Sequence, residues 1–131
     1  MATIRRIEDL DAWTKARRLV SEIYAITRNP PVKTDLGYCD QIQRAAMSAM
    51  SNIAEGFERH SDKEFAQFLN VSIASASEVS SMLHAGLDVG HLTRDQFDRL
   101  SMLCRDTILT SSKLQACLRR SARAAKSIRS K

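Results

Sequence analysis

The segment from Ser51 to Phe65 places the end of one helix beside the start of the next. Residues 51–58 continue an apolar repeat with a spacing of three or four residues, which is typical of one helix face. Ser61 and Glu64 then have the Ser-x-x-Glu spacing of a capping box, in which two side chains satisfy free amides at a helix N-terminus. The segment therefore predicts a helical hairpin.

Four segments carry apolar residues at helical spacing, and no segment shows the alternation of a strand. The first ends at the Asn-Pro-Pro run of residues 29–31, because proline lacks the amide that a helix needs. Asp35 can cap the second, Gly90 ends the third, and Thr93 with Gln96 forms another capping box. The expected helices span about residues 9–28, 35–58, 62–89 and 94–118.

The connections between these helices are short, so neighbouring helices should run in opposite directions. We therefore expect an all-α fold, an antiparallel up-down four-helix bundle formed by residues 1–118, which oligomerises to cover its broad apolar stripes. Small residues in the middle of the second and third helices should allow close approach of neighbouring helices: Ala45, Ala46, Ser48, Ala49, Ser51 and residues 72–77.

The composition agrees with one ordered helical domain, since 44% of the 131 residues are hydrophobic and only four are glycine and two proline. No apolar run approaches the roughly 20 residues of a membrane span, and the N-terminus lacks the apolar segment of a secretory signal. We therefore expect a cytoplasmic protein. The three cysteines form no Cys-x-x-Cys pair, which favours reduced thiols over a disulfide or zinc site.

The net charge of +5 is concentrated at one end of the chain. Residues 119–131 form a basic C-terminal tail, a helical extension or a disordered segment, which contains no acid. Such a tail either binds phosphates through counterion release or is a solvated helix end whose cations suit the helix dipole. Its cations are Arg119, Arg120, Arg123, Lys126, Arg129 and Lys131.

Further cations flank the first helix at Arg17 and Arg18, and the hairpin at Arg59 and Lys63. Acidic residues lie close to these cations in sequence, so a solvated face is the alternative interpretation. The candidate nucleic-acid-binding residues are therefore Arg17, Arg18, Arg59, Lys63, Arg119, Arg120, Arg123 and Lys126. Trp13 lies on the apolar stripe and is expected in the core rather than stacked on bases.

Polar residues also interrupt the apolar helix faces. Asn52, Glu55 and Glu78 must find partners there, because a buried carboxylate is costly unless it is paired or hydrogen-bonded. They form either a ligand or metal site, or structural acceptors for helix-end amides or for Arg44. We favour the second interpretation, and we assign a structural polar role to Asn52, Glu55, Ser75 and Glu78.

No motif indicates catalysis. A di-metal bundle needs Glu-x-x-His motifs on two helices, and His60, His84 and His91, which we expect at the surface or in loops, supply none. There is no Gly-x-Ser-x-Gly elbow or glycine-rich phosphate loop, and Cys39 has no evident histidine partner. We expect no enzymatic activity, no metal and no cofactor.

Several motifs occur together in this chain: Asp9-Leu10 with Trp13, Gln41-Ile42 with Arg44-Ala45-Ala46, residues 51–56, residues 61–65 with Phe68-Leu69, and Ser75 with Glu78. The combination resembles the four-helix-bundle proteins related to the 23S rRNA intervening-sequence protein, over about residues 7–118. The resemblance implies a small cytoplasmic bundle that assembles into a closed homopentamer. It also implies kinship with the accessory protein of diversity-generating retroelements, which partners a reverse transcriptase and nucleic acid.

The chain departs from the family pattern at two positions. Met50 replaces a frequent proline, so the second helix should be straighter. Ala74 replaces a frequent glycine, which leaves the closest helix approach near Ser75 undecided. No catalytic residue is implied by the resemblance.

The sequence thus favours a non-enzymatic, homo-oligomeric binding or scaffold protein that contacts RNA, DNA or a nucleic-acid-handling protein, without a membrane partner. The alternative is a purely structural assembly module that recruits another protein and does not bind nucleic acid. A small-molecule or metal-binding bundle is a third class.

Overall fold

A computed structural model describes the backbone of residues 4–130 and the side chains of residues 4–126. It contains helices α1 (Asp11–Thr27), α2 (Leu36–Phe57), α3 (Asp62–Asp88) and α4 (Arg94–Ser130), with short 3-10 helices at Ile7–Asp9 and Val32–Thr34. No strand occurs in this described part, so the prediction of an all-α fold with four helices is confirmed.

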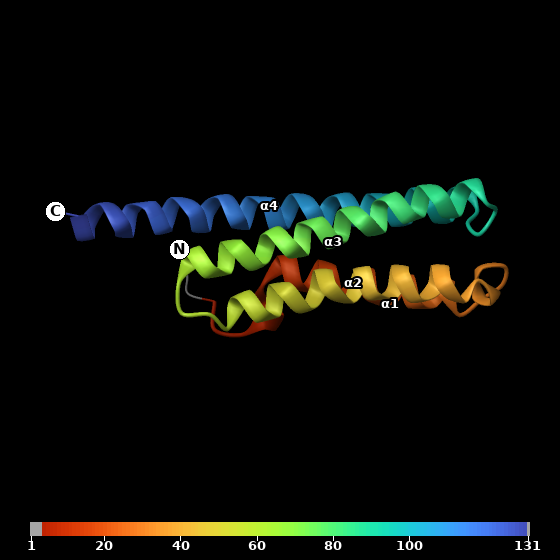
Figure 1. Ribbon diagram of the computed structural model, residues 1–131, viewed down its shortest axis with the longest axis horizontal. Helices are drawn as coiled ribbons and strands as arrows, with labels where there is room; N and C mark the ends of the chain where they lie inside the picture. Colours follow the sequence, from red (N-terminus) through yellow and green to blue (C-terminus); the bar gives the residue numbers. More distant parts are fainter. Residues whose placement is uncertain (1–3, 131) are drawn as a thin grey trace.

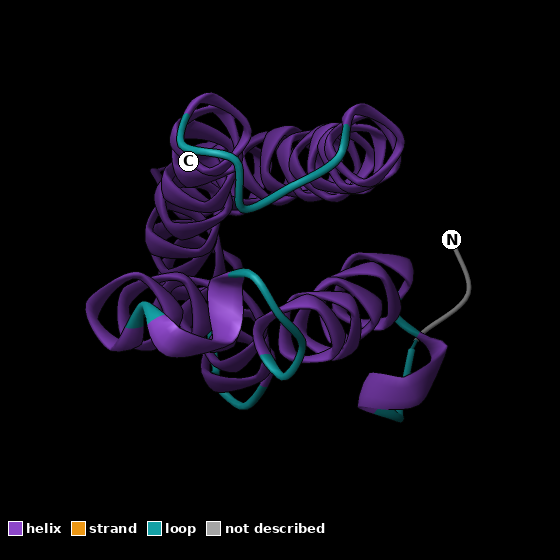
Figure 2. Cartoon of the chain, turned by 90° about the vertical axis from the view of Figure 1, so that its right-hand side faces the viewer, coloured by secondary structure: helices purple, strands orange, loops and turns teal. Residues whose placement is uncertain are grey.

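The four helices form a bundle with connections at both ends. Figure 1 shows the α1–α2 and α3–α4 connections at one end and the α2–α3 connection at the other. Figure 2 views the first of these ends, and there the side of the bundle between α1 and α4 is the most open. None of the described helices is long and apolar enough to span a bilayer.

The predicted capping residues lie at the starts of α2, α3 and α4. Ser61 Oγ accepts from the Glu64 amide at 3.1 Å. Thr93 Oγ1 accepts from the Gln96 amide at 3.1 Å, and Gln96 Oε1 accepts from the Thr93 amide at 2.9 Å. Asp35 caps α2 through its side chain. These bonds satisfy amides that have no partner within the helix.

The basic C-terminal tail is a helical extension, one of the two alternatives that the sequence left open, so α4 runs past the boundary expected near residue 118. α4 continues to Ser130 and projects beyond the α2–α3 connection, as the blue end of Figure 1 shows. The apolar repeat fades there, but alanine and arginine are strong helix formers and no glycine or proline ends the helix. The side chain of Arg129 and the whole of Lys131 lie outside the described residues.

Two clusters of buried side chains form the core. One is centred on Leu19, Ile23, Ile42, Leu83 and Leu100. The other lies toward the α2–α3 connection and contains Leu10, Ala12, Ala16, Ile53 and Leu69, with the half-buried Trp13 packed against it. Trp13 is therefore a packing residue, as the sequence predicted.

Small side chains bring α2 and α3 together between these clusters. Ser72 Oγ donates to the Ala49 carbonyl oxygen at 2.6 Å, and the Ser48 and Ser75 hydroxyls lie 2.7 Å apart. Side chains this short can reach the opposite helix only when the two backbones are close. The helices therefore approach closely at Ser75, and the Cβ of Ala74, an exposed residue, does not prevent it.

Close packing at Gly56 gives a testable prediction. A Cβ at this position would lie 2.7 Å from Phe65 Cδ1 and 2.9 Å from Phe68 Cβ. Gly56→Ala should lower the free energy of unfolding by about 1.5 kcal/mol, because α3 must shift to admit the methyl group. Gly37→Ala is the matched control in the same helix, since no heavy atom lies within 4 Å there. It should stabilise the protein by about 0.5 kcal/mol in chemical denaturation, and equal effects of the two changes would contradict this packing.

Candidate functional site

A groove forms where the C-terminal half of α4 passes over the start of α3. Its volume is about 440 Å³. The residues that line it come from both helices: Lys63, Ala66, Gln67 and Asn70 of α3, and Arg119, Ala122, Arg123 and Lys126 of α4. We call this feature the basic groove.

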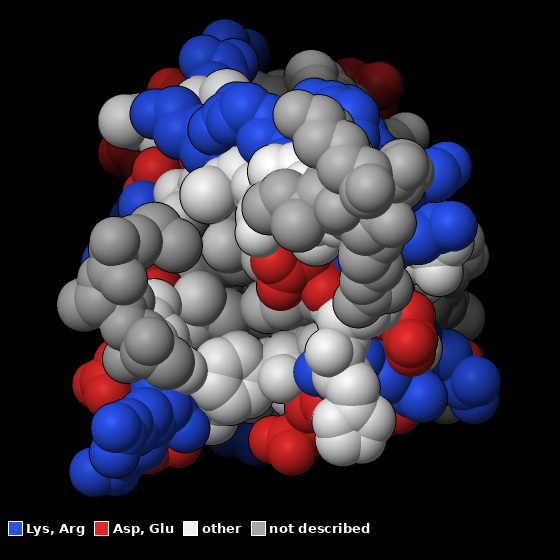
Figure 3. All heavy atoms as spheres, turned by 90° about the vertical axis from the view of Figure 1, so that its left-hand side faces the viewer, with Lys and Arg blue, Asp and Glu red and all other residues white. Residues whose placement is uncertain are grey.

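Four of the predicted cations share the basic groove. Lys63 precedes the other three by more than fifty positions, and the packing of α4 on α3 brings them together. No acidic residue is among the lining residues. Figure 3 views the molecule from the end with the α2–α3 connection, and basic side chains gather along the top of this view, over α3 and α4. Like charges this close favour binding of an anion that neutralises them.

Hydrogen bonds hold the two walls of the basic groove in place. Gln115, only 8% exposed, donates from Nε2 to the Ala66 carbonyl oxygen at 2.9 Å and to Asn70 Oδ1 at 2.5 Å. Arg119 Nη2 also donates to Asn70 Oδ1, at 3.2 Å. Farther along α4, the Ser121 hydroxyl donates to the Asp62 carboxylate at 2.6 Å. Arg119 is therefore oriented by the neutral Asn70, and no ion pair among the described side chains compensates its charge.

Sequence reasoning missed the amides of this site, Gln67, Asn70 and Gln115. A usable signal was present, because Lys63, Gln67 and Asn70 follow one another at spacings of four and three and so share one helix face. The partner of that face on α4 was not visible in the sequence.

The other predicted cations lie outside the basic groove. Arg120 is exposed and does not line it. Arg59 pairs with Glu55 at 2.5 Å and lies 4.7 Å from the centre of the Phe68 ring. Arg17 stacks over Trp13 at 5.5 Å. These intramolecular contacts occupy the guanidinium groups of Arg59 and Arg17.

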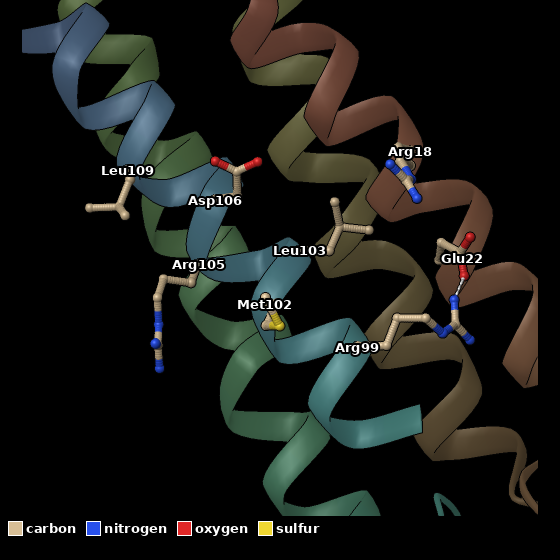
Figure 4. Close-up of a pocket in the computed structure, with 8 residues that line it drawn as sticks. All are labelled: Arg18, Glu22, Arg99, Met102, Leu103, Arg105, Asp106 and Leu109. Atoms are coloured by element: carbon tan, nitrogen blue, oxygen red, sulfur yellow. Dashed lines mark hydrogen bonds and ion pairs between the residues drawn. The ribbon is translucent and has the colours of Figure 1, made fainter. Parts of the chain in front are cut away.

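Arg18 lines a second groove, between α1 and α4, with a volume of about 630 Å³. Figure 4 shows Arg18 and Glu22 on α1 facing the helix that carries Arg99 and Asp106, with Glu22 paired to Arg99. Both acids of this groove have cationic partners, since Asp106 also pairs with a lysine of α1 at 3.1 Å. The exposed ridge of α4 beside this groove is apolar at Met102 and Leu109, which are 71% and 52% exposed.

The expected burial of Glu55 and Glu78 is wrong. Both side chains are exposed, because they lie at the edge of the apolar stripe and their carboxylates reach solvent. Glu55 pairs with Arg59 instead of Arg44, and Glu78 accepts from Gln41 Nε2 at 3.3 Å. Asn52 and Ser75 are half-buried between α2 and α3. Asn52 Nδ2 donates to the Ser48 carbonyl oxygen at 2.9 Å.

No group of three or more His, Cys, Asp or Glu side chains that could hold a metal occurs among the described residues. His60 and His84 are exposed. His91, in the α3–α4 connection, bonds through Nε2 to the Asp35 carboxylate at 2.8 Å, and this bond lowers the pKa of Asp35.

The buried thiols give no activated nucleophile. Burial raises the pKa of Cys104 to about 12 and also raises the pKa of Cys39. Because the thiolate is the nucleophile, protonated thiols of this kind are unreactive.

Comparison with known proteins places this fold in a family. No curated protein matches the chain. A solved structure of a protein with unknown function from the S23 ribosomal protein family of Bacteroides thetaiotaomicron VPI-5482 is similar in fold, with a TM-score of 0.76 at 18% identity. The similarity covers 84% of this chain and 99% of that one. The family model of the 23S rRNA-intervening sequence protein matches residues 8–113, so the chain belongs to that family.

Proposed function

We propose that this protein is a non-enzymatic, homo-oligomeric binding protein that contacts nucleic acid through the basic groove. The observation that carries the proposal is the set of four cations, drawn from two helices, that line one groove without an acid. Such a surface binds phosphate groups, because its cations neutralise them and counterions are released.

The groove is suited to phosphates rather than to bases. Its lining contains no aromatic side chain, so it offers no platform on which bases stack. Binding should therefore be independent of base sequence and should weaken as salt rises.

We further propose that the bundle is antiparallel and cytoplasmic, and that copies of it assemble into a ring, the homopentamer that the family resemblance implies. The exposed Met102 and Leu109 on α4 supply apolar surface that a second copy can cover. An oligomer repeats the basic groove once in every subunit, so modest contacts along one strand add through multivalency. The family resemblance also implies kinship with the accessory protein of diversity-generating retroelements, and on that ground we propose a nucleic-acid-handling enzyme as a further partner.

Fluorescence anisotropy with labelled RNA and DNA at low and high salt tests this proposal. The full chain should bind both at low salt. A variant with Arg119, Arg123 and Lys126 changed to glutamine should bind about a hundredfold more weakly, because it loses three phosphate contacts. Absence of binding at low salt, or undiminished binding by the variant, would overturn the proposed function. Light scattering on the same preparation should give the mass of an oligomer, and a monomer would overturn the assembly.

The competing function is a structural module that recruits another protein, and the exposed ridge at Met102 and Leu109 favours it. A pull-down from a nuclease-treated lysate separates the two functions. A protein partner survives nuclease treatment, whereas a partner bridged by nucleic acid is lost.

A further inference from the structure

We infer that the basic groove takes one phosphodiester strand, of RNA or DNA, and that Asn70 serves there both as a hydrogen-bond donor to the strand and as the residue that positions Arg119. The inference rests on the proposed function and deepens it. It follows from the placement of the cations and from the hydrogen bonds that fix the Asn70 amide.

The cations lie on both walls of the groove. Lys63 belongs to the α3 wall, whereas Arg119 and Arg123 belong to the α4 wall. Among the residues whose side chains are described, no ion pair involves any of these three. A single strand presents one row of phosphates, and cations on two facing walls can surround that row.

A duplex fits the same surface poorly. Its phosphates lie in two rows on a convex surface, and in B-form DNA these rows are separated by grooves about 12 Å and about 6 Å wide. The convex surface of a duplex touches the edges of a concave site and does not fill it. The uncharged part of the basic groove is formed by Ala66, Gln67 and Asn70 of α3 and by Ala122 of α4.

The orientation of the Asn70 amide follows from its partners. The Ala66 carbonyl oxygen can only accept, so the Gln115 atom that contacts it at 2.9 Å is the donor Nε2. That same Nε2 lies 2.5 Å from Asn70, and Arg119 Nη2 lies 3.2 Å from the same atom. Because both neighbours only donate, the Asn70 atom between them is Oδ1.

The consequence is that the other end of the amide, the donor Nδ2, points away from Gln115 and Arg119. Asn70 is exposed and lines the groove, so its Nδ2 is available there to an acceptor. A phosphate oxygen accepts such a bond, and the adjacent Arg119 strengthens its attraction. The buried Gln115 thus fixes Asn70, and Asn70 in turn holds Arg119 at the wall.

The test compares unstructured oligouridylate and oligothymidylate, each about 12 nucleotides long, with RNA and DNA duplexes of equal phosphate number. Fluorescence anisotropy at several salt concentrations gives the affinity and its salt slope. We expect both single strands to bind at least about tenfold more tightly than the duplexes. Similar affinity for RNA and DNA identifies the shared phosphodiester backbone as the ligand.

Two arginines of α4 that lie three positions apart supply a matched pair of variants. Arg123→Gln, inside the groove, should weaken single-strand binding about fivefold and reduce the salt slope by about 0.7. Arg120→Gln removes the same charge from the same helix but outside the groove, and should change the affinity less than about twofold. Equal effects of the two changes would indicate that the strand is attracted by the net charge of the protein and not by the groove.

Asn70→Asp tests the role of the amide, because it keeps the shape of the side chain while replacing the donor with a carboxylate that pairs with Arg119. It should weaken binding more than about tenfold. Gln67→Glu, on the same face of α3, is the second variant and should weaken binding in the same direction. Circular dichroism and light scattering establish that both variants remain folded and assembled.

The outcomes distinguish a failure of the single-strand groove from a failure of nucleic-acid binding itself. If duplexes bind as tightly as single strands, or if Arg120→Gln equals Arg123→Gln, the single-strand groove is wrong while nucleic-acid binding stands. If Asn70→Asp and Gln67→Glu both bind like the unmodified chain, these two amides do not contribute to binding of the strand. If no nucleic acid binds at low salt, the proposed function itself fails.

Discussion

Replacing Leu83 with alanine should lower the free energy of unfolding by about 3 kcal/mol, a loss that includes the transfer of the side chain to water and the cavity left behind. Leu83 is fully buried in α3, in the same cluster as Ile23, Ile42 and Leu100. These neighbours come from the other three helices, so they cannot close the cavity without moving a whole helix. Urea denaturation at fixed protein concentration measures the effect, since assembly makes stability depend on concentration.

Leu36→Ala is the control for this prediction. It makes the same chemical change at the start of α2, where the side chain is 77% exposed, and should shift the free energy of unfolding by less than about 0.5 kcal/mol. A loss at Leu36 as large as that at Leu83 would mean that Leu36 is covered in the assembled protein.

The features that the sequence predicted correctly depend on the spacing of residues close together in the chain. The repeat of apolar residues located all four helices, and the capping residues Ser61 and Thr93 marked the starts of α3 and α4. Both depend on residues within one or two turns of each other, so a linear pattern contains the needed information. The sequence left open whether the tail after residue 118 is helical, because the apolar repeat stops before the helix does.

The candidate site depends on contacts between segments far apart in the chain, and these were only partly predictable. The sequence identified Lys63 and Arg119 as basic residues, but their common groove depends on where α4 crosses α3. It also suggested that Glu55 lies in an apolar face, whereas the rotation of α2 exposes that carboxylate to solvent. Periodicity gives the face of a helix to within about one residue, and that margin decides whether a charge at the edge is buried.

A close contact between α2 and α3 gives the second large effect, at Ser72, which is 1% exposed. Its hydroxyl donates to the Ala49 carbonyl oxygen at 2.6 Å, so the two backbones lie too close for a larger side chain. Ser72→Leu should lower the free energy of unfolding by about 3 kcal/mol, because it forces the helices apart and removes a buried hydrogen bond. Ser72→Ala loses only the bond and should cost about 1 kcal/mol. Thermal and urea denaturation of the two variants should therefore rank them in that order. A leucine variant as stable as the alanine variant would show that the small-residue layer between α2 and α3 has room to spare, and close packing would then not explain its composition.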